Sequence, residues 1–137
     1  MTIQAAITHI QGLAESLTGI RQAADFPPEQ MNVFPFAVCY PGAGQFQAGP
    51  MGLMKGLHDL VVEIHVARKD LPRDVEAALP FGELLAAAVL DDPTLGGTVD
   101  TVRADEGIAY TFGALAWGGQ ATVGWRLTIP VKIQTVL

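Results

Sequence analysis

Three polar side chains that could do chemistry alternate along one stretch of the sequence. Asp59, Glu63 and His65 stand at odd positions, and His58 is adjacent to them. Odd positions of a β-strand share one face, so these groups could form an acid–base pair or a metal site. Side chains two positions apart on a strand are separated by roughly 7 Å, which is too far for one ion without help from another segment. We therefore expect a plain solvated or subunit-facing surface here, and structural or exposed roles for His9, His58 and His65.

Residues that could act as nucleophiles or bind a nucleotide lack their usual surroundings. Ser16 is the only serine, and it lies inside an expected helix, whereas a serine nucleophile needs a sharp turn beside a base. Cys39 lies in an apolar stretch, where burial raises a thiol pKa. Gly42 and Gly44 follow an expected strand, but Gln47 stands where a dinucleotide-binding motif has its third glycine. The sequence therefore predicts no enzyme activity, no catalytic residue, no metal and no cofactor.

The composition suggests contact with other chains. Of the 137 residues, 50% are hydrophobic and 16% are charged, against a charged fraction of about 25% in an average globular protein. This length predicts a single domain over residues 1–137. The surplus of apolar side chains is expected to be buried partly against another protein molecule.

Charge and hydropathy exclude several classes of partner. The formal net charge of -6 disfavours attraction to nucleic acid phosphates, although it is compatible with a channel through which DNA slides without sticking. Apolar runs fall short of the roughly 20 residues that cross a bilayer, and the N-terminus has no signal-peptide pattern. We expect no membrane, no sequence-specific nucleic acid binding, and an origin in the cytosol.

The first half of the chain predicts a helix, two strands and an arm. Apolar residues at spacings of three and four indicate a helix that begins after Thr2 and ends by Gly19, followed by a proline-rich linker with Pro27, Pro28 and Pro35. Residues 36–40 and 58–68 are expected strands, the second half-buried. Between them lies a glycine-rich loop or hairpin arm, whose apolar side chains need a partner and are our first interface candidates: Phe46, Pro50, Met51, Leu53 and Met54.

The second half predicts a helix followed by two strands. The helix begins near Asp70, is kinked or divided at Pro80 and stops at residues 91–93. A strand region over 98–116 then leads to a hairpin turn at 117–120. The last strand, 121–133, alternates clearly, and its proline predicts a position at or near a sheet edge, where another subunit could add. Our remaining interface candidates lie on this strand: Arg126, Pro130 and Lys132.

Together these elements predict an α+β fold. We expect a mostly antiparallel four-stranded sheet with two helices on one face, in the order α-β-β-α-β-β, and an extended hairpin arm. The tryptophans Trp117 and Trp125 are expected in the hairpin or the core.

Three blocks of sequence resemble the small tail terminator proteins of long-tailed, siphovirus-like bacteriophages. The blocks are residues 26–42 (FPPEQMNVFPFAVCYPG), residues 56–73 (GLHDLVVEIHVARKDLPR) and residues 92–97 (DPTLGG). The resemblance implies a structural virion protein that forms a hexameric ring, caps the tail tube, ends its polymerisation and joins the tail to head-completion or connector proteins. It also implies a location in the tail and neck of the virion, after assembly in the host cytoplasm.

Two other functions stay open. One is a different neck component, such as a head-completion or connector adaptor protein, which would bind the portal instead of the tube. The other belongs to another class, an enzyme or small-ligand module that uses Asp59, Glu63 and His65 with His58 nearby; it requires converging titratable groups.

Overall fold

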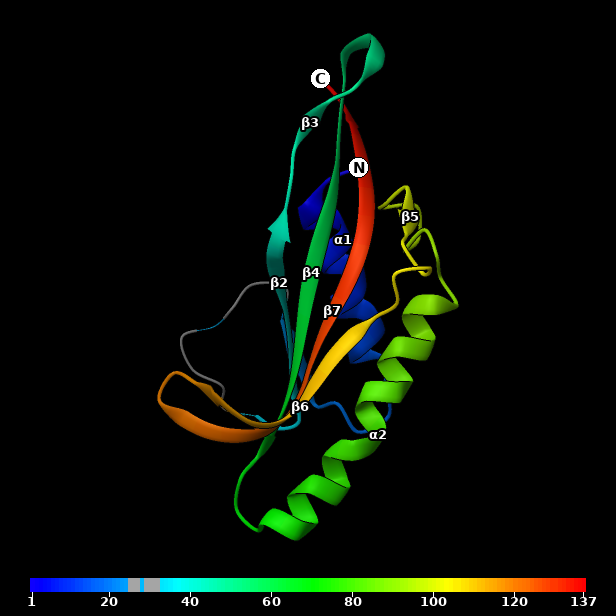
Figure 1. Cartoon of the computed structure of the whole chain (residues 1–137). Coiled ribbons are helices and arrows are strands. Elements are labelled where there is room, and N and C mark those ends of the chain that lie inside the picture. The colour runs from blue at the N-terminus through cyan, green and yellow to red at the C-terminus, as the bar shows by residue number, and fades with distance from the viewer. Residues whose placement is uncertain (25–27, 29–32) are drawn as a thin grey trace.

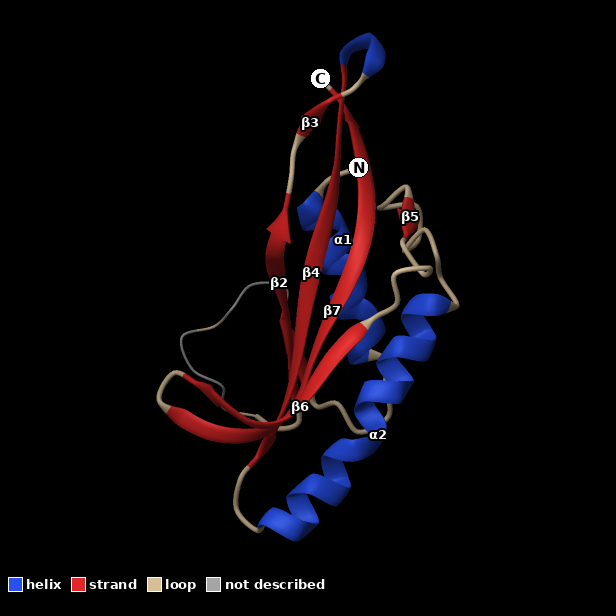
Figure 2. Ribbon diagram, viewed as in Figure 1, coloured by secondary structure: helices blue, strands red, loops and turns tan. Residues whose placement is uncertain are grey.

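Two α-helices lie on one face of a long twisted sheet in the computed structural model, which describes residues 1–24, 28 and 33–137 (Figures 1 and 2). The helices are α1 (Ile3–Glu15) and α2 (Leu71–Leu90), and a 3₁₀ turn covers Pro50–Gly52. The strands are β1 (Gln22–Ala24), β2 (Phe36–Gly44), β3 (Gln47–Ala48), β4 (Leu53–Ala67), β5 (Thr101–Val102), β6 (Ala109–Trp117) and β7 (Gln120–Val136).

The sheet has seven strands and is mixed, which corrects the expected four-stranded sheet. Its order is β1-β2-β4-β7-β5, while β3 also pairs with β4 and β6 with β7. The pairing of β1 with β2 is parallel and the other pairings are antiparallel. The α+β class fits, but the order α-β-β-α-β-β is wrong because it omits β1, β3 and β5. These strands are two or three residues long and depend on a neighbouring strand, so no periodicity marks them.

The first helix follows its sequence pattern closely. The Thr2 hydroxyl accepts a hydrogen bond from the Ala5 N–H at 3.0 Å, which caps the helix as expected. Its apolar stripe packs on the sheet through Ala6, Ile7, Ile10 and Ala14. The proline-rich linker that we expected next falls largely on residues 25–27 and 29–32, outside the described residues.

The second helix runs without a break through Pro80. Its buried face packs against the core, where the Trp125 indole N–H donates to the Ala78 carbonyl at 2.8 Å. Gly82 brings the helix close to the sheet, because a Cβ there would lie 2.5 Å from the Trp125 ring. Over the described residues, neither helix combines the length and the apolar character that crossing a bilayer requires.

The last strand lies one strand in from the sheet edge, so the prediction of a position at or near an edge holds only as a position next to the edge. β7 pairs with β4 over its length and with β5 and β6 on its other side. Pro130 faces the break between β5 and β6, and its carbonyl accepts from the Arg103 N–H at 2.8 Å. A proline is therefore tolerated inside the sheet. The segment between β5 and β6 is not part of the ladder at the position where Pro130 lacks a backbone N–H.

The central strand β4 is buried on both faces, whereas we expected a half-buried strand. Its even positions face the helices within the main core. On the opposite face Phe36 and Val38 pack with Phe34 and Trp117. Trp117 comes from the β6–β7 hairpin, which turns back over this face through the two-residue turn predicted from sequence, so the polar face of β4 is covered.

Candidate functional site

Two polar residues of the enzyme hypothesis, Glu63 and His65, belong to a small network across three neighbouring strands. On β4, His65 Nε2 lies 2.9 Å from Glu63 Oε1. The Tyr40 hydroxyl on β2 donates to the other oxygen of Glu63, and His65 Nδ1 lies 2.6 Å from the Thr122 hydroxyl on β7. The structure therefore joins Glu63 and His65 directly, although we expected alternate strand positions to be too far apart to act on one centre.

Burial and hydrogen bonding fix the protonation states of Tyr40 and Glu63 at neutral pH. Burial, strengthened by the bond to Glu63, raises the pKa of Tyr40 to about 12. Burial alone would raise the pKa of Glu63, but hydrogen bonds from His65 and Tyr40 and the nearby Arg126 outweigh it and lower that pKa below its ordinary value. Tyr40 stays protonated and Glu63 ionised at neutral pH, which suits a permanent structural bond.

The network is closed to a reacting molecule in this conformation. His65 is fully buried, and both oxygens of Glu63 and both ring nitrogens of His65 have partners inside the network. The Trp117 ring covers it at 5.9 Å from His65, and its indole N–H donates to the Pro28 carbonyl at 2.6 Å. A general acid or base must reach its substrate by a hydrogen bond, and here those positions are occupied.

The other residues of the enzyme hypothesis lie elsewhere. Asp59 is partly exposed and has no hydrogen bond to the network among the described residues. His58 is buried near the start of α1, its ring 4.9 Å from that of Phe46, and burial lowers its pKa. Cys39 is buried beneath α1. No group of three or more potential ligands among the described residues could hold a metal ion.

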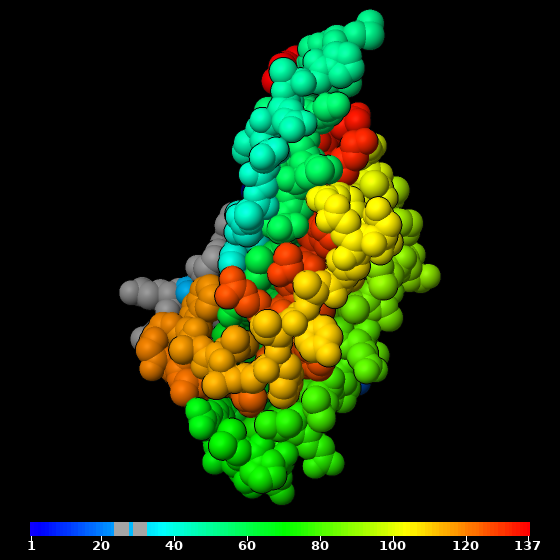
Figure 3. All heavy atoms as spheres, in the orientation of Figure 1, coloured from blue at the N-terminus to red at the C-terminus, as the bar shows by residue number. Residues whose placement is uncertain are grey.

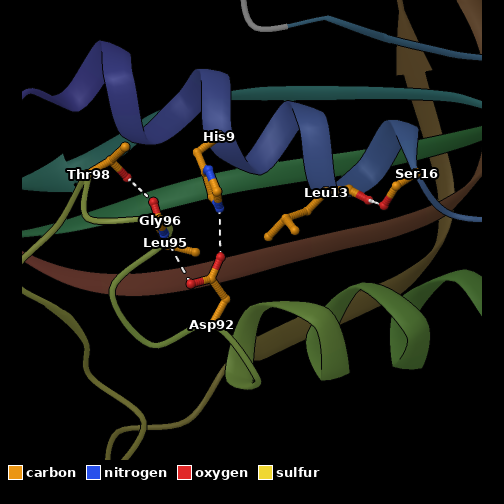
Figure 4. Close-up of polar contacts among 7 residues, drawn as sticks. All are labelled: His9, Leu13, Ser16, Asp92, Leu95, Gly96 and Thr98. Carbon is orange, nitrogen blue, oxygen red and sulfur yellow. Dashed lines mark hydrogen bonds and ion pairs between the residues drawn. The ribbon is translucent and has the colours of Figure 1, made fainter.

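His9 has a structural role, in a contact that joins the two helices. Its Nε2 lies 2.7 Å from Asp92 Oδ2 in the turn after α2, and the other Asp92 oxygen accepts from the Gly96 N–H at 3.0 Å (Figure 4). The Gly96 N–H and His9 together lower the pKa of Asp92. Ser16 lies at the end of α1 and donates to the Leu13 carbonyl at 2.7 Å, so it has a capping role.

A long arm extends from the sheet, and we define it as residues 45–57 together with 132–137. The first part of β4 pairs here with the end of β7 and with β3, and the Leu137 N–H donates to the Gly52 carbonyl at 2.8 Å. Gly44 and Gly56 allow the close approach of the chains, since a Cβ on Gly56 would lie 2.0 Å from the Gln45 carbonyl oxygen. Figures 1 and 3 show the arm projecting well beyond both helices.

The arm exposes large apolar side chains, with Phe46 near its base and the others at its end. Phe46 is 66% exposed, Met51 98%, Val136 78% and Leu137 79%. Pro50 is also exposed, whereas Leu53 and Met54 are partly buried. Apolar patches on a projecting element are typical of protein–protein contacts. Six of our interface candidates therefore lie on the arm, these five and Lys132, and Val136 and Leu137 join them.

The three interface candidates chosen on β7 do not lie on an open edge. Arg126 is exposed, but its strand has β4 on one side and β6 on the other. Pro130 is buried, and the Lys132 ammonium lies 3.6 Å from Asp100. We chose these residues because we expected β7 to have a free edge. On the side of β5 that free edge begins only after Lys132, the last residue of β7 that pairs with β5.

A hollow beside the start of α2 was not predicted from sequence. It encloses about 620 Å³ between the start of α2 and the ends of β4 and β7, and it is lined by Arg21, Arg68, Lys69, Asp74 and apolar side chains. Arg21 is far in the sequence from Arg68 and Lys69. Only the adjacent basic pair, Arg68 and Lys69, could therefore have indicated this hollow from the sequence.

Other missed residues could not be found from sequence. β7 continues past residue 133 to Val136 and so places the C-terminus along the arm, but the apolar alternation stops at Ile133 and did not signal this extension. Tyr40 and Thr122 carried no signal, because their role depends on strand register.

A comparison with protein-family models finds no match, and a comparison with curated proteins finds none either.

Proposed function

We propose that this chain is a structural, ring-forming protein that closes the tail tube of a long-tailed bacteriophage and links it to the proteins of the neck. The resemblance of residues 26–42, 56–73 and 92–97 to tail terminator proteins suggests this identity. The observation that carries the proposal is the arm, because its shape and its exposed apolar side chains suit docking and serve no purpose within the chain.

The arm is rigid enough to act as a docking element. Its two long strands are the continuous ends of β4 and β7, paired residue by residue from Leu53 opposite Val136 to Lys55 opposite Gln134. It therefore presents Met51, Val136 and Leu137 at a fixed position relative to the body. Preformed contact surfaces reduce the entropic cost of assembly.

A ring and a terminated polymer place different demands on the surface. A ring needs two different patches that meet head to tail, and a terminator needs a face that fits the growing tube while its opposite face does not. The arm lies at one end of an elongated molecule, so it can contact a tube while other surfaces join ring neighbours.

The test compares an arm variant with a matched control for the ability to bind and stop tail tubes. Met51→Ser/Val136→Ser removes apolar surface from the arm, whereas Leu79→Ser/Leu84→Ser removes it from α2, where both leucines are about half exposed. We expect wild type and the α2 control to cosediment with purified tubes and to limit their length in electron micrographs. The arm variant should lose binding at least tenfold.

Two results would contradict the proposal. One is equal tube binding by the arm variant and the wild type. The other is binding of the wild type to isolated portal or connector but not to tubes, which would identify an adaptor of the neck instead.

A further inference from the structure

The hollow beside the start of α2 concentrates positive charge in an acidic protein. Arg21, Arg68 and Lys69 line it, and these are three of the eight basic residues of a chain whose net charge is -6. All three side chains are exposed, and none forms an ion pair with another residue that the structure describes. We call these three residues and Asp74 the basic hollow.

Asp74 offsets one of the three positive charges but forms no ion pair with a described cation. One of its carboxylate oxygens accepts backbone N–H groups from Lys69 at 2.6 Å and from Asp70 at 2.7 Å. The carboxylate is thus held by the first turn of α2, whose dipole it compensates. Among the described residues, Arg68 and Lys69 thus have no acidic partner and can accept an acid from another molecule.

The opposite end of α2 carries the opposite charge. Five acids surround the turn after the helix and the loop between β5 and β6, against two bases, and we call them the acidic corner: Asp91, Asp92, Asp100, Asp105 and Glu106. The Val102 N–H donates to the Pro93 carbonyl at 2.6 Å, which holds this loop beside the turn.

The bases of the acidic corner are already paired, so two acids are left. Arg103 pairs with Glu106, and Lys132 lies 3.6 Å from Asp100. No basic residue in the described part of the chain pairs with Asp91 or Asp105, and both are exposed. The last turn of α2 carries no basic residue, so these acids also face the negative end of the helix dipole.

The two patches are too far apart to satisfy each other within one molecule. They lie at opposite ends of α2, which has 20 residues and is therefore about 30 Å long (Figure 1). Charges on the surface are screened beyond about 8 Å at physiological salt. Neither patch can therefore satisfy the other within one molecule, and each is free to meet a patch of another molecule.

We infer that the basic hollow of one molecule receives the acidic corner of a second copy of this chain. The contact joins two different patches at opposite ends of the protomer, so it is the head-to-tail type that closes into a ring when the rotation between neighbours allows it. This inference rests on the proposed ring and names the surfaces that form it.

A second copy explains both patches at once, and a nucleic acid does not. The charge outside the three cations is more negative than the net charge of the whole chain, so a polyanion would be repelled by most of the surface. The acidic corner of another copy presents a few carboxylates, and the apolar wall of the hollow, which includes Phe34 and Val66, suits the apolar atoms around them.

Charge reversal tests the contact. In a first variant, Arg68→Glu/Lys69→Glu makes the hollow acidic, and in a second, Asp91→Lys/Asp105→Lys makes the corner basic. Each variant then has two patches of like charge, so each should be monomeric in native mass spectrometry where the wild type forms rings. An equimolar mixture of the two should restore rings in which the variants alternate, and the four substitutions combined in one chain should restore rings as well.

The outcomes separate this inference from the proposed function. Rings of either single variant, or no rings from the mixture, would overturn the charged contact, while tube binding by these proteins would leave the proposed function intact. Rings that are abolished and restored as expected, but that do not bind tubes, would support the contact and count against the tail terminator. A wild type that stays monomeric at every concentration would overturn both.

Discussion

At the scale of single residues, Glu63 holds three strands together. It accepts from Tyr40 on β2, and it bonds His65 of its own strand, whose other ring nitrogen meets Thr122 on β7. A carboxylate with this many partners in a buried place stabilises the fold only while all of them are present, because each lost partner leaves an unsatisfied polar group. The network thus links the centre of the sheet to the hairpin that covers it.

We predict that Glu63→Ala lowers the free energy of unfolding by about 3 kcal/mol, because the Tyr40 hydroxyl and the His65 ring each lose a buried partner. Urea titration at neutral pH measures this loss. The control is Glu76→Ala on the exposed side of α2, which should change stability by less than about 0.5 kcal/mol. A loss at Glu63 as small as at Glu76 would show that the network is not important for stability.

The lowered pKa of Glu63 predicts a dependence of stability on pH. The folded pKa lies below the unfolded value, so the ionised carboxylate contributes stability that is fully present above the ordinary pKa of 4.5 and is lost as the pH falls through the lower folded pKa. Glu63→Gln keeps a side chain of the same shape without this titration. Its stability should therefore fall less steeply in acid than that of the wild type, and an identical slope would contradict the assignment.

At the scale of elements, sequence periodicity predicted long segments well and short ones poorly. The apolar stripe from Ile3 onward and the alternation from Ala121 onward were strong because each covers many residues of one period. β5, with two residues, has no period to show. Pro130 predicted a position of β7 at or near a sheet edge. β7 lies one strand in from the edge, and Pro130 faces the segment between β5 and β6, which is not part of the ladder.

The packing of α2 on the sheet depends on Gly82, and this predicts the effect of a single methyl group. A Cβ at this position would lie 2.5 Å from the Trp125 ring, so Gly82→Ala should destabilise the protein by about 2 kcal/mol despite the better helix propensity of alanine. Thermal unfolding checks this. In Gly12→Ala on α1 a Cβ would meet nothing within 4 Å, so that variant should be stabilised by up to about 1 kcal/mol. Equal effects at both sites would contradict the close packing.

At the scale of the whole molecule, function depends on what the fold leaves uncovered. Apolar residues from 46 to 54 could be chosen from sequence because glycines and prolines between them argue against a buried element. The contribution of Val136 and Leu137 could not, because it depends on the pairing of β7 with β4 at the end of the arm. The basic hollow was missed for the same reason, since Arg21 and Arg68 meet only after folding.

Contact between the arm and a tube should be visible as protection of backbone amides. In the isolated protein, amides at the end of the arm are near solvent and should exchange faster than those of the doubly buried part of β4. Addition of purified tail tubes should slow exchange at residues 45–57 and 132–137 by an order of magnitude or more, which hydrogen–deuterium exchange with mass spectrometry measures. The exposed hairpin turn at Gly118 and Gly119 should keep its rate, since it lies far from the arm. Protection at the hairpin turn without protection of the arm would mean that the tube binds the opposite end of the molecule.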